Sequence, residues 1–177
     1  MKITFYTDGA SRGNPGNGGW GVYAEVVGSN GEMKDFKLSG GKSYTTNNKM
    51  ELTACIQALR FLDAIILDKY FVDKKNLGKE FLVTVKTDSQ YVRKGITEWI
   101  INWQKNNWKG ANKKPVLNKE LWQEFLDLKN LINKKLLENN FPEIKFEYVK
   151  GHAGIKGNEI ADELATIAAD KVVEQEG

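Results

Sequence analysis

The chain has 177 residues, of which 41% are apolar, and its net charge is +3. This length and apolar content suffice for a single domain with a substantial core, which is expected to cover residues 1–177. An apolar signal region and a run of about 18 apolar residues are both absent, so the sequence predicts neither a membrane span nor export, but a cytoplasmic protein. The one cysteine, Cys55, excludes an intrachain disulfide. Its position beside Ile56 and Leu59 at helical spacing favours a buried core residue over a nucleophile.

Apolar alternation and a hairpin signal at 29–32 predict three successive strands in an antiparallel meander. From Asn47 the apolar period becomes helical. The elements expected in chain order are strands at 2–8, 20–27 and up to about 39, a helix from 47, a charged loop at 68–80, a strand at 81–87, helices from 89 and near 97–107, a helix from 118, a strand at 144–149 and a helix at 158–173. This order predicts an α/β fold with a mixed sheet.

Four acids lie in short polar motifs: Asp8, Glu51, Asp88 and Asp162. Asp8 and Asp88 each follow a threonine at the expected end of a strand, and the other two lie near expected helix starts. Each acid alone has an ordinary explanation, as a turn former, a first-turn helix acid or a solvated residue. Their joint pattern suggests a single convergent site.

Such a site would be rich in hard oxygen ligands and almost free of sulfur and imidazole, which suits Mg²⁺ or Mn²⁺ far better than Zn²⁺. Clustered carboxylates raise one another's pKa until cations neutralise them. Two Mg²⁺ ions about 4 Å apart can stabilise both the attacking and the leaving oxygen of a phosphodiester displacement. The acids therefore indicate phosphoryl chemistry.

Positive charge is concentrated in one segment of the chain. Between Arg93 and Lys119 there are seven lysines and arginines and one acid, Glu98, with tryptophans interleaved among them. Basic groups beside flat aromatic rings suit a nucleic-acid backbone and its sugars. An amphipathic helix with a solvated lysine face and buried tryptophans explains the segment equally well when it is considered alone.

One short glycine-rich motif suggests nucleotide binding but does not fit it. Residues 40–43, Gly-Gly-Lys-Ser, resemble the end of a nucleotide-binding P-loop, but Phe36 replaces the first required glycine and no helix is expected to start at Lys42. The sequence therefore does not predict ATP binding.

At the acid motifs the chain resembles type 1 ribonuclease H of the bacterial type. The matching stretches are Thr7-Asp8-Gly9 with Gly13-Asn14-Pro15-Gly16, Thr46-Asn47-Asn48-Lys49-Met50-Glu51-Leu52, Thr87-Asp88-Ser89-Gln90-Tyr91-Val92, and Val149-Lys150-Gly151-His152-Ala153-Gly154 with Gly157-Asn158-Glu159 and Asp162. They follow the family's order and cover nearly the whole chain.

The resemblance implies a ribonuclease H-like fold, an α/β fold with a five-stranded mixed sheet (a three-stranded antiparallel meander plus two further strands) flanked by helices. It implies a monomeric endoribonuclease that cuts the RNA strand of RNA–DNA hybrids by a two-metal-ion mechanism. The products expected are 3′-hydroxyl and 5′-phosphate ends. The expected cofactor is Mg²⁺, two per site in the substrate complex, with Mn²⁺ as an alternative.

The resemblance also implies roles for the site residues. Asp8 would bridge the two metals, Glu51 and Asp88 would flank one each, and Asp162 would complete the second. His152, the only histidine, lies between glycines and would move a proton for the attacking water or the leaving group. A merely structural or exposed histidine is the alternative.

Substrate contacts are implied in the same way. Residues expected to bind the hybrid are Asn14, Asn47 and Gln90 at the RNA 2′-hydroxyls, Thr46 and Asn118 in a phosphate pocket for the DNA strand, Trp99 and Trp103 along its deoxyriboses, and Lys105, Lys109, Lys113 and Lys114 in the basic segment. Glu51 is able to accept a 2′-hydroxyl proton as well as bind metal. Turn formation and helix capping are the alternatives for the asparagines, and capping is expected for Asn47 in addition.

Some features depart from the family or stay open. Tyr44 stands where an arginine often joins the phosphate pocket, so the pocket is either weaker or recruits Lys42. Glu159 shares a helix face with Asp162, and a metal-related role and a plain first-turn acid are equally favoured. Stretches near 68–80 and 128–142 are longer than in compact relatives, and no separate hybrid-binding module is expected before the first strand.

Two other functions fit parts of the pattern. A transposase or integrase core would use a related acidic site, but the His-Ala-Gly loop and the asparagines argue against it. A catalytically silent hybrid-binding module would not need four acids, since these repel phosphate.

Overall fold

The computed structural model describes residues 1–69 and 80–176, so most of the loop expected at 68–80 lies outside the described residues. In chain order the elements are β1 (Lys2–Ser11), β2 (Gly16–Val27), β3 (Met33–Thr45), α1 (Asn47–Phe61), the π-helical η1 (Leu62–Leu67), β4 (Leu82–Thr87), α3 (Gln90–Lys94), the π-helical η3 (Gly95–Trp99), α4 (Ile100–Lys105), α5 (Lys119–Glu138), β5 (Lys145–Tyr148) and α6 (Lys156–Glu176). Within this part of the chain, no helix has the length and apolarity that a membrane crossing requires.

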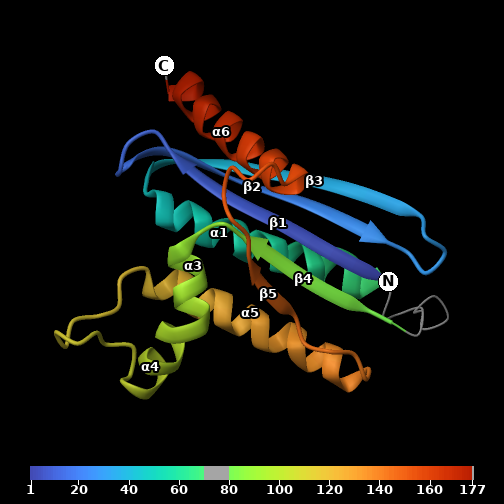
Figure 1. The fold of residues 1–177 in the computed structure, drawn as a ribbon. Coiled ribbons are helices and arrows are strands. Elements are labelled where there is room, and N and C mark those ends of the chain that lie inside the picture. Colours follow the sequence, from blue (N-terminus) through green and yellow to red (C-terminus); the bar gives the residue numbers. More distant parts are fainter. Residues whose placement is uncertain (70–79, 177) are drawn as a thin grey trace.

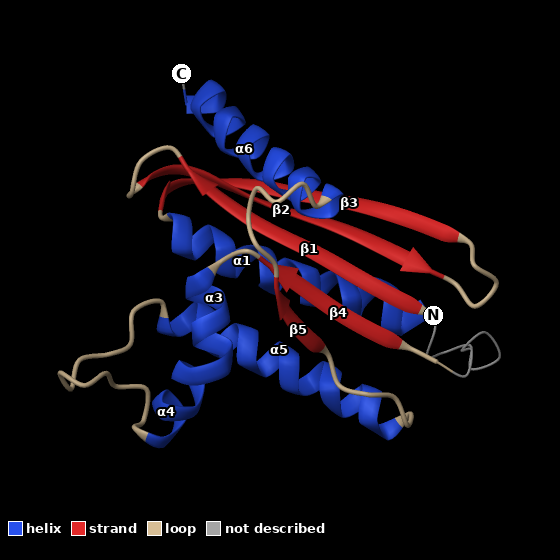
Figure 2. Cartoon of the chain, viewed as in Figure 1, coloured by secondary structure: helices blue, strands red, loops and turns tan. Residues whose placement is uncertain are grey.

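The described strands form one five-stranded sheet in the order β3-β2-β1-β4-β5 (Figure 2). β1, β2 and β3 pair antiparallel as a meander, whereas β4 and then β5 add in parallel to β1. Parallel neighbours need a crossover connection, and α1 supplies it between the meander and β4. This topology confirms the predicted five-stranded mixed sheet.

Helices cover both faces of the sheet (Figure 1). α6 packs across β1, β2 and β3 on one face, while α1 packs on β1 and β2 on the other and is backed by α5. Glycines in β2 permit the close approach of α6: a Cβ on Gly21 would lie 2.4 Å from the carbonyl oxygen of Ala161. The core lies mainly between the sheet, α1 and α5, with Phe5, Leu59 and Trp122 fully buried.

Three strands are longer than the sequence predicts, and β2 begins at Gly16 rather than at residue 20. β1 continues past Asp8 to Ser11, so Asp8 lies within the strand rather than at its end, because the ladder with β2 extends to the Ser11–Gly18 pair. β3 continues past residue 39 to Thr45 because Gly40 and Gly41 pair with β2 instead of ending the strand. The P-loop-like residues 40–43 are therefore strand residues, and no helix begins at Lys42.

The helices predicted from 89 and near 97–107 form one run from Gln90 to Lys105, with the π-helical η3 in its middle. Its start is capped by Ser89, whose hydroxyl accepts a hydrogen bond from the Val92 N–H. Gly95 is required where this run meets α5, because a Cβ there would lie 2.1 Å from the Trp122 ring. The helices predicted from 118 and at 158–173 are confirmed in type, and α6 extends beyond both predicted ends.

Cys55 is confirmed as a core residue. It is fully buried in α1, and its Sγ lies 3.4 Å from the Thr7 hydroxyl of β1. Burial raises the pKa of the Cys55 thiol to about 12, so the reactive thiolate is disfavoured.

Candidate active site

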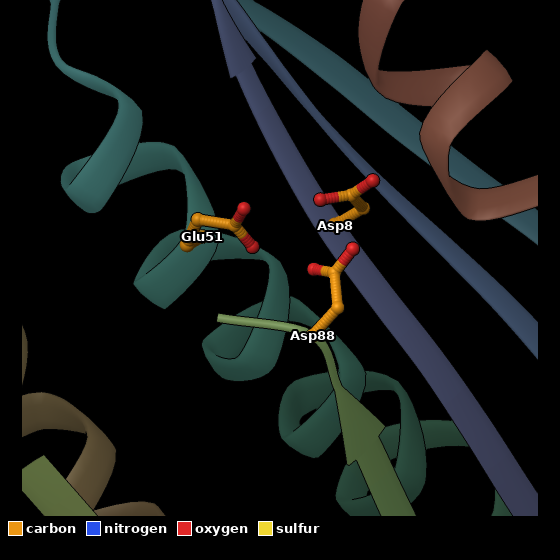
Figure 3. A group of neighbouring side chains, drawn as sticks. All are labelled: Asp8, Glu51 and Asp88. Carbon is orange, nitrogen blue, oxygen red and sulfur yellow. The ribbon is translucent and has the colours of Figure 1, made fainter. Parts of the chain in front are cut away.

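Three of the four predicted acids converge (Figure 3). Asp8 projects from β1, Asp88 follows the last residue of β4, and Glu51 comes from the first turns of α1, with the three carboxylates pointing toward one another. Each offers a carboxylate oxygen, and these oxygens all lie within 4.8 Å of one another. Gly9 allows α1 to approach this closely, because a Cβ there would lie 2.3 Å from the Glu51 backbone nitrogen.

The shared environment raises the pKa of all three acids. Burial, followed by the charge of Asp88, raises the pKa of Asp8 from 3.8 to about 7, against hydrogen bonds from Glu51 and the Gly9 N–H that lower it. Burial and then the charges of Asp8 and Asp88 raise the pKa of Glu51 well above its usual value. The pKa of Asp88 rises chiefly by burial. In the metal-free protein the protonated form of Glu51 is therefore favoured relative to that of a free glutamate.

The acid trio, Asp8, Glu51 and Asp88, fits a hard divalent cation. Oε2 of Glu51 is buried and finds no hydrogen-bond partner among the described residues, so an acceptor is left for a ligand. All the donor atoms of the trio are carboxylate oxygens, the ligands that Mg²⁺ and Mn²⁺ prefer. A bound cation would also remove the repulsion that raises the three pKa values.

The structure does not place Asp162 in the trio. It is half-buried on α6, and its charge contributes to raising the pKa of Asp8 and Asp88, so it lies near them without joining the compact group. Like charges without a cation between them repel, which opposes a tighter fourfold cluster. Glu159, one turn earlier on α6, is exposed.

The loop that carries His152 begins at the acid trio. A Cβ on Gly151 would lie 2.9 Å from Oδ2 of Asp88, so this glycine is in contact with the carboxylate. His152 follows it, with an exposed side chain and a left-handed backbone φ of 55°. An exposed imidazole next to the acid trio has the access to water that proton transfer needs.

Asn158 was assigned no role by the sequence reasoning. It is a buried residue in the first turn of α6, 4% exposed, and its polar side chain keeps the pKa of Asp88 lower than burial alone would make it. The only signal in the sequence was its place in the Gly157-Asn158-Glu159 motif.

The residues before α1 are tied together by their side chains. Oδ1 of Asn14 accepts a hydrogen bond of 3.3 Å from the Asn47 N–H, and Oγ1 of Thr46 accepts one of 3.2 Å from the Lys49 N–H. Thr46 is thus the N-cap of α1, and the capping role expected for Asn47 is wrong, because Asn47 is already the first helical residue. The side chain of Asn47 stays exposed and free for another contact.

Gln90 is the first residue of α3, two positions after Asp88. Its Nε2 donates to the Tyr148 hydroxyl at 3.0 Å, and its Oε1 accepts from Arg93 at 3.4 Å. Arg93 also lies 5.2 Å from the centre of the Tyr148 ring. These contacts orient an exposed amide beside an exposed cation.

The basic segment combines both interpretations that its sequence allowed. Trp99, Trp103 and Trp108 are half-buried and lie ring to ring at 5.8 and 6.0 Å, so they are partly structural. Its four predicted contact lysines are all exposed: Lys105, Lys109, Lys113 and Lys114. The segment therefore combines exposed positive charges with partly buried aromatic rings.

Asn118 is held at the start of α5. The Tyr91 hydroxyl accepts hydrogen bonds from Asn118 Nδ2 at 3.0 Å and from Trp122 Nε1 at 2.9 Å. Asn118 also lines a groove of about 570 Å³ together with Lys42, Lys49 and Lys119. Two glutamates, Glu120 and Glu124, also line this groove. The Lys42 alternative raised by the sequence is thus compatible with the geometry.

Comparisons with known proteins agree on one family. The RNase H family model matches residues 1–170. Curated proteins named Ribonuclease H are similar along most of their length: the one from Chromohalobacter salexigens is 44% identical over 97% of this chain and 86% of its own, and the one from Ruthia magnifica is 46% identical over 97% of both chains.

Two solved structures are also similar. LC9-RNase H1, described as a type 1 RNase H with the type 2 active-site motif, is 28% identical with a TM-score of 0.74 and covers 96% of this chain and 72% of its own. LC11-RNase H1, solved in complex with an RNA/DNA hybrid, is 26% identical with a TM-score of 0.53 and covers 97% of this chain and 99% of its own.

Proposed function

This chain belongs to the ribonuclease H family, and we propose that it is an endoribonuclease that hydrolyses the RNA strand of RNA–DNA hybrids, leaving 3′-hydroxyl and 5′-phosphate ends. The observation that carries the proposal is the acid trio, whose carboxylate oxygens lie within 4.8 Å of one another on three different elements. Three acids with raised pKa values destabilise a protein unless a ligand uses them.

Asp8, Glu51 and Asp88, with Asp162 at the edge of the site, would hold two Mg²⁺ ions, or Mn²⁺ in their place. When bound, such ions supply positive charge for the attacking and leaving oxygens of a phosphodiester. The chain's own contribution is to bring Asp8, Glu51 and Asp88 together with their carboxylates pointing toward one another, and Asp8 would serve as a ligand to both ions. Asp162 stands outside the trio and would join it once the charges are neutralised.

His152 would move protons in the same reaction. Its side chain is exposed, and the adjacent Gly151 contacts Asp88, so an imidazole swinging from this loop can reach water beside the acids. An imidazole is the side chain best suited to accept and release protons at neutral pH. His152 therefore acts as the general base or proton shuttle in the proposal.

Recognition of the RNA strand would depend on its 2′-hydroxyl groups. Asn14, Asn47 and Gln90 carry exposed amides that can both donate to and accept from a 2′-hydroxyl. Glu51 would accept a 2′-hydroxyl proton in addition to its metal role. DNA offers no such group, so these contacts would discriminate between the two strands.

The DNA strand would follow the basic segment toward α5. Thr46 and Asn118 would bind one of its phosphates, assisted by Lys42, which lines the same groove as Asn118. Trp99 and Trp103 would contact deoxyribose faces, and Lys105, Lys109, Lys113 and Lys114 would contact neighbouring phosphates. The protein would act as a monomeric single domain over residues 1–177 in the cytoplasm.

A cleavage assay tests this function. A hybrid labelled on its RNA strand should be cut only in the presence of Mg²⁺ or Mn²⁺, whereas double-stranded DNA and double-stranded RNA of the same sequence should stay intact. The products should be ligatable 5′-phosphates. Binding of the hybrid without cleavage would identify a silent binding module instead, and strand transfer into DNA would identify a transposase-like core.

A further inference from the structure

The side-chain amide of Gln90 is held at both of its ends. Its Nε2 donates a hydrogen bond of 3.0 Å to the Tyr148 hydroxyl, and its Oε1 accepts one of 3.4 Å from the Arg93 guanidinium. A glutamine side chain has several rotatable bonds, so a single contact leaves the direction of its amide undefined. An acceptor beside the nitrogen and a donor beside the oxygen together define which way each end of the amide faces.

Tyr148 occupies a fixed position in the sheet. It is the last residue of β5 and pairs with Thr87 of β4, which in turn pairs with Thr7 of β1. These three residues form one row across three parallel strands, and Asp8 and Asp88 are the next residues after two of them. The backbone of Tyr148 is therefore held at a defined distance from the acid trio by strand pairing.

Arg93 contacts both of the other members of this cluster. Besides its hydrogen bond to Gln90, its guanidinium carbon lies 5.2 Å from the centre of the Tyr148 ring, within the range of a cation–π contact. A tyrosine side chain has only two torsions, and a cation over its face restricts them further. The Tyr148 hydroxyl is consequently an acceptor held in place, rather than a side chain that follows Gln90.

The Gln90 amide can still bind a hydroxyl group. Its two hydrogen bonds use one of its two N–H donors and one of the two lone pairs on its oxygen, so one donor and one acceptor remain. A ribose 2′-hydroxyl both donates and accepts, and it is therefore complementary to what remains. Gln90 is exposed and lies two positions after Asp88, so a nucleotide at the acid trio has access to it.

We propose that Tyr148 is a positioning residue for RNA recognition, whose hydroxyl orients the Gln90 amide toward the 2′-hydroxyl of a ribonucleotide. The inference rests on the proposed function, which takes Gln90 as a contact to the RNA strand. Without the Tyr148 hydroxyl the amide would have to be ordered when the hybrid binds, and ordering a side chain on binding lowers affinity. Tyr148 thus acts on RNA through Gln90.

Tyr148→Phe tests the proposal because it removes the hydroxyl and keeps the ring that Arg93 contacts. The matched control is Tyr23→Phe in β2, which also removes one strand tyrosine hydroxyl, there a donor to Asp35 at 3.2 Å. Dissociation constants for the hybrid are measured in Ca²⁺ for these variants, for Gln90→Ala and for the double variant Gln90→Ala/Tyr148→Phe. Urea unfolding midpoints are recorded for every protein.

Tyr148→Phe should weaken hybrid binding by about 3- to 10-fold, the usual range for the loss of one hydrogen bond, and Tyr23→Phe should leave it unchanged. In the Gln90→Ala background Tyr148→Phe should have no further effect, because no amide is left to orient. An unchanged affinity in Tyr148→Phe would overturn the proposal. An equal loss in both backgrounds would also overturn it, since the hydroxyl would then contact the hybrid directly or act on the fold.

A second readout responds to recognition of the 2′-hydroxyl and not to a general structural defect. It uses a set of hybrids that each carry a single deoxynucleotide at a different place in the RNA strand. The wild-type protein should lose affinity when the nucleotide that Gln90 contacts is changed, and Gln90→Ala and Tyr148→Phe should both be less sensitive at that same nucleotide. Reduced sensitivity of Tyr148→Phe at a different nucleotide would contradict the positioning role.

Cleavage of the hybrid by the wild-type protein is scored separately. Coupling between Tyr148 and Gln90 in a protein that binds the hybrid without cutting it would reject the proposed function alone. Cleavage without such coupling would reject the positioning role alone.

Discussion

Thr7 of β1 pairs with Thr87 of β4 at the end of their parallel ladder. The next residues, Asp8 within β1 and Asp88 just after the end of β4, therefore lie at the same level of two adjacent strands, as parallel pairing requires. Repulsion between them is built into the backbone pairing and cannot be relieved by changing rotamers alone. Replacement of one acid should consequently alter both the chemistry and the stability of the metal-free protein.

Asp8→Asn should abolish hydrolysis of the hybrid while leaving the fold intact. The amide is nearly isosteric but removes the charge from an acid whose carboxylate points toward those of Glu51 and Asp88. Single-turnover cleavage with Mg²⁺ measures the loss, and Asp127→Asn, which alters an exposed acid on α5, is the control. Turnover within tenfold of wild type would remove Asp8 from the centre of the mechanism.

Stability of the metal-free protein should fall as pH rises from about 4 to about 7. The pKa of Asp8 is raised from 3.8 to about 7, so the folded state binds more protons than the unfolded state in this window, and such a state loses stability as pH increases. Above pH 7 the full penalty is present.

Asp8→Asn should therefore be more stable than wild type at pH 7.5 in EDTA, by on the order of 2 kcal/mol. This is less than the full shift in pKa would give, because Glu51 and Asp88 share the protonation of the cluster. Urea unfolding between pH 4.5 and 8 measures the effect. If the free energy of unfolding depends on pH in the same way in both proteins, the charge of Asp8 does not destabilise the metal-free state.

Cys55 should resist alkylation in the native protein. It is fully buried, and burial raises its pKa to about 12, so the thiolate that reacts is scarce at neutral pH. Labelling with iodoacetamide should follow global unfolding in urea, with a midpoint equal to that seen by fluorescence. Labelling well below that midpoint would show that α1 opens locally beneath the acid trio.

His152→Ala should lower kcat by between about 10- and 10⁴-fold, the range for a lost proton transfer, and change hybrid affinity little. Lys150→Ala, in the same loop, is the contrast: it removes an exposed cation and should weaken binding at low salt with kcat preserved. Steady-state kinetics and a binding assay in Ca²⁺ separate the two effects. If affinity falls as far as kcat in His152→Ala, the histidine contacts substrate instead.

The sequence was sufficient for the acids because each lies where a periodic pattern changes. Asp8 and Asp88 follow apolar alternations, and Glu51 follows a capping cluster, so their elements and approximate ends were predictable. Their mutual distances were not, since these depend on the β1–β4 register and on Gly9 allowing α1 to approach. The same limit explains why Asp162 was grouped with the other three.

Residues whose roles come from burial could not be predicted in the same way. The two hydrogen bonds that the Tyr91 hydroxyl accepts, from Asn118 and Trp122, join elements far apart in sequence. Gly40 and Gly41 were taken as the end of a strand because glycine usually weakens one. In the structure they keep β3 paired where it lies under α6, and a Cβ on Gly41 would clash with Val172.

Replacing Lys105, Lys109, Lys113 and Lys114 with glutamine should weaken hybrid binding and flatten its salt dependence. All four are exposed and none belongs to the acid trio, so the chemical step should be nearly unchanged at saturating hybrid. For every lysine–phosphate pair that the substitutions remove, the slope of log affinity against log salt should fall by about 0.7 to 0.9. The slope is obtained by measuring the affinity for the hybrid at several salt concentrations between about 50 and 200 mM.

The control replaces four exposed lysines outside the segment, Lys34, Lys37, Lys134 and Lys171, so that net charge changes equally. If the basic segment grips the hybrid, only the first set lowers the slope, because long-range attraction by net charge is the same in both. Equal, small changes in both sets would mean that the four lysines are a solvated face over structural tryptophans. In that case affinity would have to come from the groove lined by Lys42, Lys49 and Lys119.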